Sequence, residues 1–176
     1  MQILTILNQK GGVGKTTTCS ALANMLKLEG YRVLAVDMDS QANLSYSYGI
    51  DLANADNIFD VLTKGMEPKV AIQHTHQTDI LSSNIMLSGA ERHFSGVGRY
   101  YLLKKALAKV ENDYDFCIID TTPSLSVTTL NAILASNYLI ITSDTDVYSI
   151  QGFADLFQTI EEVKEMNPEL KVIGIL

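Results

Sequence analysis

The chain has 176 residues, of which 47% are hydrophobic and 19% are charged, and this balance indicates a globular rather than a disordered polypeptide. Its formal net charge of −7 argues against a surface that binds nucleic acid over its whole area, although a local basic patch is compatible with it. No apolar run reaches the length of a membrane helix and no basic segment opens a signal sequence, so we expect one cytoplasmic domain covering residues 1–176.

A glycine-rich stretch near the amino terminus is the most informative part of the chain. Residues 3–7 form an apolar run typical of a buried strand, and residues 19–26 have a helical composition. Between them, residues 8–18 read N-Q-K-G-G-V-G-K-T-T-T. A strand, a glycine-rich loop and a helix in this order form a phosphate-binding loop, whose backbone N–H groups point inward. We therefore expect Lys15 to reach the terminal phosphates and the Thr16 hydroxyl to bind Mg²⁺.

The second apolar run, residues 32–36, is continuous rather than alternating, which predicts a parallel strand covered on both faces. An acidic segment, D-M-D-S-Q-A-N at residues 37–43, follows it. Ligands of an open α/β sheet bind beyond the carboxyl ends of its strands. Residues two apart in an extended segment share a side, so Asp37 and Asp39 could face one metal or water. A polar turn is the alternative, and the segment taken alone favours that alternative.

The middle of the chain carries weaker signals. We expect a short helix at 57–62, a short strand at 79–83 and a helix over 88–110 that is interrupted near two glycines. The last of these carries the densest basic group of the chain, Lys104, Lys105 and Lys109. A solvated helix face is favoured over DNA contact as the explanation of these lysines.

Four apolar residues at 116–119 lead into Asp120. This pattern predicts a buried strand whose carboxylate emerges at its carboxyl end to hold a water ligand of Mg²⁺. Common by itself, the pattern becomes specific when it is paired with the phosphate loop. Beyond it we expect a helix at 130–134, a strand at 138–142, a helix from 149 to about 166 and another buried strand at 171–176.

The two cysteines, Cys19 and Cys117, lie far apart in sequence and each belongs to an apolar element. We interpret both as reduced core residues of a cytosolic protein. A role in binding a metal cluster would require cysteines on exposed loops.

Three segments together resemble the ParA/MinD family of ATPases. The string K-G-G-x-G-K-T-T is similar to that family's deviant Walker A motif, and the preceding Asn8-Gln9 is most similar to the ParA, DNA-partitioning branch. Residues 37–43 resemble the family's D-x-D-P-Q-x-N, with Ser40 in place of the proline. Residues 120–124 resemble D-x-P-P-S, with Thr122 at the first proline.

The resemblance implies a three-layer α/β fold of the P-loop NTPase type, with a mostly parallel sheet, helices on both faces, and ATP and Mg²⁺ as cofactors. It implies catalytic roles for Lys10, which would reach the phosphates bound by a second protomer, for Lys15, and for Asp39, which would orient the attacking water. The implied nucleotide contacts are Lys10, Gly11, Gly12, Val13, Gly14, Lys15, Thr16 and Thr17, and the implied Mg²⁺ residues are Thr16, Asp37 and Asp120.

The function implied by the resemblance is a Mg²⁺-dependent ATPase that dimerises with ATP and acts as a switch in plasmid or chromosome partitioning. A ParB-type DNA-binding protein is the implied partner, and non-specific DNA is a further candidate. Family members continue for another third of their length, so we expect this chain to lack that carboxyl-terminal third. The alternatives are a MinD-like cell-division ATPase, an ATP-driven metabolic enzyme on the same fold, and a truncated module that binds nucleotide without hydrolysis.

Overall fold

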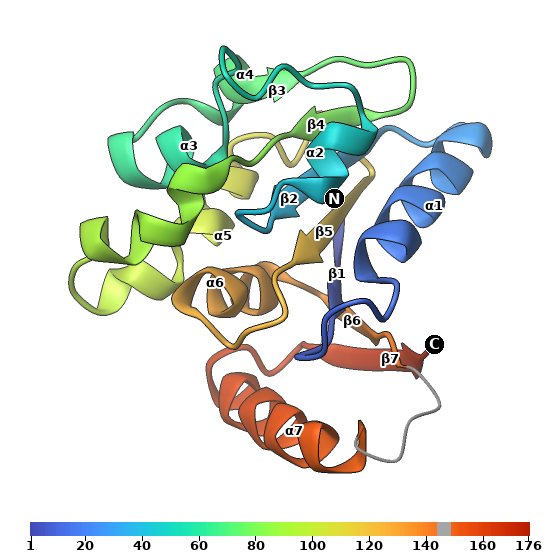
Figure 1. Cartoon of the computed structure of the whole chain (residues 1–176), viewed down its shortest axis with the longest axis vertical. Coiled ribbons are helices and arrows are strands. Elements are labelled where there is room, and N and C mark those ends of the chain that lie inside the picture. Colours follow the sequence, from blue (N-terminus) through green and yellow to red (C-terminus); the bar gives the residue numbers. More distant parts are fainter. Residues whose placement is uncertain (144–148) are drawn as a thin grey trace.

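The computed structural model describes residues 1–143 and 149–176, and within them a seven-stranded sheet organises the fold. The strand order is β3-β4-β2-β5-β1-β6-β7 (Figure 1). Neighbouring strands are parallel except β3 and β4, which are antiparallel. The strands are β1 (Gln2–Leu7), β2 (Val33–Met38), β3 (Ile72–Gln73), β4 (Asp79–Leu81), β5 (Phe116–Thr121), β6 (Tyr138–Ile141) and β7 (Lys171–Ile175).

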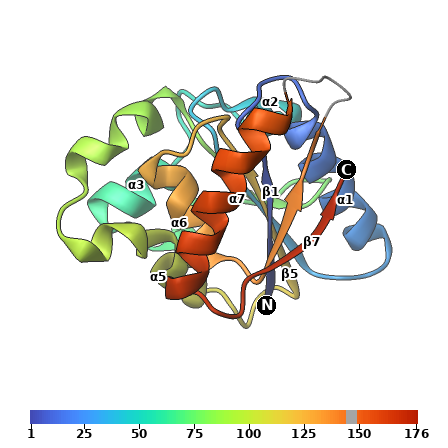
Figure 2. The same ribbon diagram turned by 90° about the horizontal axis from the view of Figure 1, so that it is seen from below.

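Helices cover both faces of this sheet, which confirms the predicted three-layer α/β fold (Figures 1 and 2). One face carries α1 (Lys15–Leu28) and α2 (Asn43–Ser47). The opposite face carries the remaining helices, which are α3 (Ile58–Lys64), α4 (Pro68–Ala71), α5 (Leu102–Ala108), α6 (Val127–Ala135) and α7 (Ser149–Met166), with the 3₁₀ helices η1 (Ile85–His93) and η2 (Val97–Tyr100). In the described part of the chain, no helix is long and apolar enough to span a bilayer.

Strand β2 shows why a continuous apolar run forms a central parallel strand. All six of its residues are buried. Val33 and Ala35 pack into the core beneath α1, whereas Leu34 and Val36 pack into the core on the other face. Since both faces are covered, the alternating positions that precede Asp37 are apolar on both of them. Cys19 and Cys117 are free thiols buried in these same cores, as predicted.

Capping residues and glycines fix the ends of α1 and α3. Helix α3 begins after Asn57, whose side chain accepts a hydrogen bond from the backbone N–H of Phe59 in a capping box with Asp60. It ends at Gly65, whose φ of 69° is left-handed. Gly30 follows α1 with a φ of 92°. Both glycines adopt a backbone conformation that other residues reach only with strain.

Two expectations need correction. The segment expected to be an interrupted helix over 88–110 is two 3₁₀ helices followed by α5, because Gly96 turns the chain with a φ of 68°. Strand β7 was expected to be buried, but it lies at the end of the sheet order, and Ile173 and Ile175 are 52% and 59% exposed. An apolar run indicates a strand without distinguishing a central strand from an edge strand.

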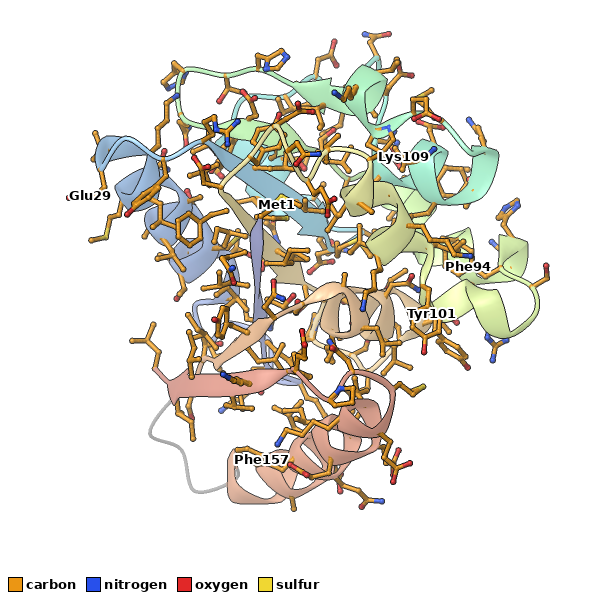
Figure 3. All side chains as sticks on the ribbon, turned by 180° about the vertical axis from the view of Figure 1, so that it is seen from behind. Met1, Glu29, Phe94, Tyr101, Lys109 and Phe157 are labelled. Atoms are coloured by element: carbon orange, nitrogen blue, oxygen red, sulfur yellow. The ribbon has the colours of Figure 1, made fainter. Side chains whose placement is uncertain are left out.

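The lysine group of α5 lies on an exposed surface, as expected for a solvated helix face. The Nζ of Lys109, labelled in Figure 3, is 2.7 Å from the Oε1 atom of Glu67. Exposed ion pairs of this kind contribute little to stability, in the range of about 0–1 kcal/mol. Lys104 and Lys105 are exposed on the same helix.

Candidate nucleotide-binding site

The glycine-rich loop connects the end of β1 at Leu7 to the start of α1 at Lys15. Gly12 and Gly14 have left-handed φ angles of 76° and 82°, so glycine is required at both positions. A Cβ atom built on Gly11, Gly12 or Gly14 would meet no described atom within 4 Å. The loop is therefore an open cradle of backbone, and the amino terminus of a 14-residue helix faces it.

Lys15 is held against this cradle. Its side chain is buried, and its Nζ donates a hydrogen bond of 2.8 Å to the backbone carbonyl of Lys10. Burial lowers the pKa of the Lys15 ammonium, and the nearby carboxylates of Asp120 and Asp39 oppose that shift. The backbone N–H of Lys10 donates to the Oδ1 of Asn8, which fixes the start of the loop.

Asp120 lies at the carboxyl end of β5, in register with Ile6 of β1 and Asp37 of β2. The hydroxyl of Thr16 donates to its Oδ2 over 2.6 Å. Its Oδ1 is buried and has no hydrogen-bond partner among the described residues. Burial raises the pKa of Asp120 to about 7; the Thr16 hydroxyl opposes this shift, and the Asp37 and Asp39 carboxylates reinforce it.

The two aspartates of residues 37–43 occupy different environments. Asp37 is fully buried inside β2, and its carboxylate accepts hydrogen bonds from Ser45 and from the backbone N–H of Asp39. Burial raises the pKa of Asp37 to about 6, and the hydrogen bonds from Ser45 oppose the shift. Asp39 follows the strand, and its Oδ1 accepts from the backbone N–H of Gln41 over 2.9 Å.

A cavity of about 520 Å³ brings most of these residues together. It is lined by the loop, the start of α1 and the segment after β2, namely Gly11, Gly12, Gly14, Lys15, Thr16, Thr17, Asp39, Gln41, Asn43 and Pro123. Lys10, Asp37 and Asp120 do not line it, although Asp120 and the Lys10 carbonyl are bonded to the lining residues Thr16 and Lys15. Gln41, Asn43 and Pro123 were not among the predicted site residues, although all three belong to segments that resemble family motifs. Their place at the carboxyl ends of β2 and β5 was the signal that could have identified them.

A second cavity of about 520 Å³ lies at the opposite, amino-terminal edge of the sheet, where Arg32, Lys69, His74 and Asp113 line it. Three of its charged residues pair within the protein, namely Lys69 with Asp113, His74 with Asp79 and Arg32 with Asp115, and the ammonium of Lys27, which also lines it, donates to the His76 carbonyl. The open glycine cradle lines the first cavity, and Asp120, whose Oδ1 has no partner among the described residues, is bonded to Thr16 of that lining, so the phosphate chemistry belongs there.

The donor set at the first cavity fits a magnesium nucleotide. Mg²⁺ in such sites is held by few protein groups, with phosphate oxygens and waters completing its shell. Thr16 and the free Oδ1 of Asp120 supply such groups, and the described residues contain no cluster of three histidine, cysteine or acidic side chains that would hold a metal by themselves. The fold and this site define a P-loop nucleotide-binding protein.

Comparison with known proteins narrows this class. A family model described as an AAA domain matches residues 1–172. The sporulation initiation inhibitor protein Soj of Bacillus subtilis is 37% identical over 180 residues, which cover 99% of this chain and 71% of Soj. The chain therefore belongs to this family, the ParA/Soj group of P-loop ATPases. The chain spans about seven-tenths of the length of that relative.

Solved structures with the same fold include proteins with bound adenine nucleotides. The cobyrinic acid a,c-diamide synthase of Mycobacterium smegmatis with bound ADP and magnesium has a TM-score of 0.96 and 39% identity, and the match covers all of this chain and 74% of that one. A putative plasmid partition protein of Borrelia burgdorferi bound to AMPPNP has a TM-score of 0.86 and 32% identity, covering 99% of this chain and 73% of that one. Magnesium and adenine nucleotides are thus bound by relatives of the same fold.

The raised pKa of Asp120 predicts a pH dependence of stability. Between its ordinary pKa of 3.8 and about 7, the folded state holds a proton that the unfolded chain has released. The free energy of unfolding of the nucleotide-free protein should therefore fall through this window as pH rises. Asp120→Asn removes this contribution, so urea unfolding should show the variant gaining about 2–3 kcal/mol relative to the wild type between pH 5 and pH 8.

The matched control is Asp115→Asn. The bonds from Arg32 lower the pKa of Asp115 to about 2, so this carboxylate stays charged throughout the same pH range. The difference between this variant and the wild type should be constant from pH 5 to pH 8. A constant difference for Asp120→Asn as well would contradict the raised pKa of Asp120.

Proposed function

We propose that this chain binds MgATP in the first cavity, hydrolyses it, and uses the cycle as a dimerisation switch in plasmid or chromosome partitioning. One observation carries the proposal: Lys15, the Thr16–Asp120 pair and Asp39 gather around one open glycine cradle at the carboxyl edge of the sheet. The names of the Borrelia plasmid partition protein and of a related chromosome partitioning protein ParA of Myxococcus xanthus support the biological setting.

In this proposal, Lys15 and the backbone N–H groups of the loop bind the phosphates. The Thr16 hydroxyl and the free oxygen of Asp120 hold the metal and its water ligands. Mg²⁺ held there would supply neutralisation of phosphate charge during transfer of the terminal phosphoryl group to water. Asp39 orients the attacking water, and its bond to the backbone of Gln41 fixes its direction. The adjacent Pro123 closes the cavity from the segment after β5.

The role proposed for Lys10 requires a dimer of this chain. Its backbone carbonyl accepts the Lys15 ammonium, so its side chain starts at the loop that cradles the phosphates. From that position it adds positive charge to the phosphates bound by a second protomer. A ParB-type protein would stimulate hydrolysis, and non-specific DNA is a further candidate partner of this cytoplasmic, nucleoid-associated protein.

Lys10→Ala tests the dimer. The variant should bind ATP within about threefold of the wild type, because its own cradle is intact, but it should remain monomeric with ATP. Light scattering gives the oligomeric state, and calorimetry gives the affinity. Lys109→Ala, which removes a lysine paired with Glu67, is the control and should dimerise normally. A normal ATP-dependent dimer of Lys10→Ala would contradict the proposed role.

The structural relative named cobyrinic acid a,c-diamide synthase supports a second candidate, an ATP-driven synthetase, since its identity of 39% equals or exceeds that of the partition proteins. Measuring ATP turnover of the wild type separates the candidates. Turnover stimulated by DNA and a ParB-type protein supports the switch. Turnover that requires cobyrinic acid supports the synthetase, and ATP binding without turnover under any of these conditions supports a non-hydrolysing module.

A further inference from the structure

The Asp37 carboxylate is saturated by hydrogen bonds from its own chain. Its Oδ2 accepts from the backbone N–H of Ser45 at 2.9 Å and from the Ser45 hydroxyl at 2.7 Å. Its Oδ1 accepts from the backbone N–H of Asp39 at 3.0 Å. Asp37 and Ser45 are both fully buried. In contrast, the Oδ1 of Asp120 has no hydrogen-bond partner among the described residues.

Ser45 connects three segments. While its hydroxyl donates to Asp37 at the end of β2, the same oxygen accepts from the backbone N–H of Ser83, just beyond β4, at 2.9 Å. Ser45 itself belongs to α2. Since the hydroxyl donates once and accepts once, its hydrogen goes to the carboxylate and its lone pair to Ser83. This one side chain therefore fixes α2 against the carboxyl ends of two parallel strands.

The loop held between these ends carries Asp39. Asp37 binds the backbone N–H of Asp39, and the Asp39 carbonyl accepts from Ala42, which precedes α2. Ala42 has a left-handed φ of 55°, a conformation that a residue with a Cβ adopts only when its surroundings impose it. The amino end of the loop of residues 39–42 is thus bonded to Asp37, its carboxyl end runs into α2, which Ser45 holds in place, and Asp39 of that loop lines the cavity.

We propose that Asp37 and Ser45 form a buried anchor that positions Asp39 for the attack of water, and that Asp37 is not part of the Mg²⁺ shell. The inference rests on the proposed function, in which Asp39 orients that water. Ser45 is a positioning residue: it acts through Asp37 and the loop and does not line the cavity. A shift of about 1 Å in a group that orients a reactant reduces turnover by as much as about 100-fold.

Ser45→Ala is the first test. It removes the hydroxyl and keeps the backbone N–H that binds Asp37. The turnover number for ATP should fall about 10- to 100-fold, while the dissociation constant for MgATP changes less than about threefold. Ser45→Thr retains a hydroxyl and should recover most of the turnover. Ser47→Ala is the matched control, because the Ser47 hydroxyl of the same helix donates to the Leu44 carbonyl and has no link to Asp37.

Hydrogen exchange makes the test independent of turnover. In the MgADP complex, the Asp39 amide should exchange at least about tenfold faster in Ser45→Ala than in the wild type or Ser47→Ala, because its acceptor is less firmly held. If the wild type hydrolyses no ATP, the proposed function fails, and this measurement still decides the inference. Unchanged exchange and unchanged turnover in Ser45→Ala would overturn the anchor.

Asp37→Asn separates the anchor from a metal role. The anchor predicts that the Mg²⁺ concentration giving half-maximal nucleotide binding is the same as in the wild type. A metal-shell role predicts that this concentration rises by about tenfold or more, and that result would overturn the inference. If Ser45→Ala does not fold, the Mg²⁺ dependence of Asp37→Asn and the exchange rate in Ser45→Thr decide the question.

Discussion

Lys15→Ala should abolish detectable ATP binding, raising the dissociation constant by at least about 100-fold. Losing one buried charged partner of an anionic ligand costs about 2–5 kcal/mol, which corresponds to roughly 30- to several-thousand-fold in affinity. The ammonium of Lys15 is buried against the phosphate cradle, so no water replaces it at low cost. Isothermal titration with a slowly hydrolysed ATP analogue, in the presence of Mg²⁺, measures the effect.

The control for this prediction is Lys27→Ala, at the other end of α1. The Lys27 ammonium donates to the carbonyl of His76, far from the loop, and the variant should bind ATP as the wild type does. Because Lys15→Ala also removes the bond to the Lys10 carbonyl, its thermal unfolding should be compared with that of the wild type. A folded Lys15→Ala protein with unchanged ATP affinity would refute the assignment of the phosphate loop.

The parts of the site that are local in sequence could be predicted. The order of strand, glycine-rich loop and helix places Lys15 and Thr16 by covalent connection alone. Asp120 was also predictable, because it ends a buried strand and parallel strands share their carboxyl edge. What needed the structure is the pairing across the sheet: the bond from Thr16 to Asp120 joins residues 104 positions apart, and no periodicity encodes it.

The two aspartates in register at the ends of β2 and β5 illustrate this limit. Asp37 and Asp120 are direct neighbours across the sheet, and each ends an apolar run. Their difference arises from Ser45, whose hydroxyl saturates Asp37, whereas Thr16 leaves one oxygen of Asp120 without a partner among the described residues. A serine in a short polar helix carries no signal of that contact, so the sequence predicted a metal role for both.

The exposed strand β7 shows a second limit, this time in the fold. Residues 171–176 have the apolar composition of a core strand. The pairing of β7 with β6 confirms that residues 171–175 form a strand. Its position at the end of the sheet order is decided by which strands the preceding helices connect, and that depends on tertiary packing. The composition of residues 171–176 is that of a strand covered on both faces, but it does not predict their exposure: Leu176 is 69% exposed.

Asp39→Ala should separate ATP binding from hydrolysis. Removing a group that positions or deprotonates the attacking water lowers the chemical rate by about 10²- to 10⁴-fold. The phosphate cradle and the Thr16–Asp120 pair are untouched by the change, so the dissociation constant for MgATP should remain within a fewfold of the wild type. A dimer formed on ATP addition should then persist, because the step that loosens it is blocked. Single-turnover hydrolysis and light scattering over time measure both effects.

Asp39→Asn distinguishes the charge of this side chain from its structural bond. The asparagine oxygen can still accept the Gln41 N–H that Asp39 binds at 2.9 Å, so the loop keeps its conformation while the carboxylate charge is lost. If both variants lose hydrolysis, the charge acts on the attacking water. Hydrolysis retained by asparagine and lost by alanine would show that Asp39 only shapes the loop. Normal turnover in Asp39→Ala would remove this residue from the mechanism, and with it the reason for a buried anchor at Asp37 and Ser45.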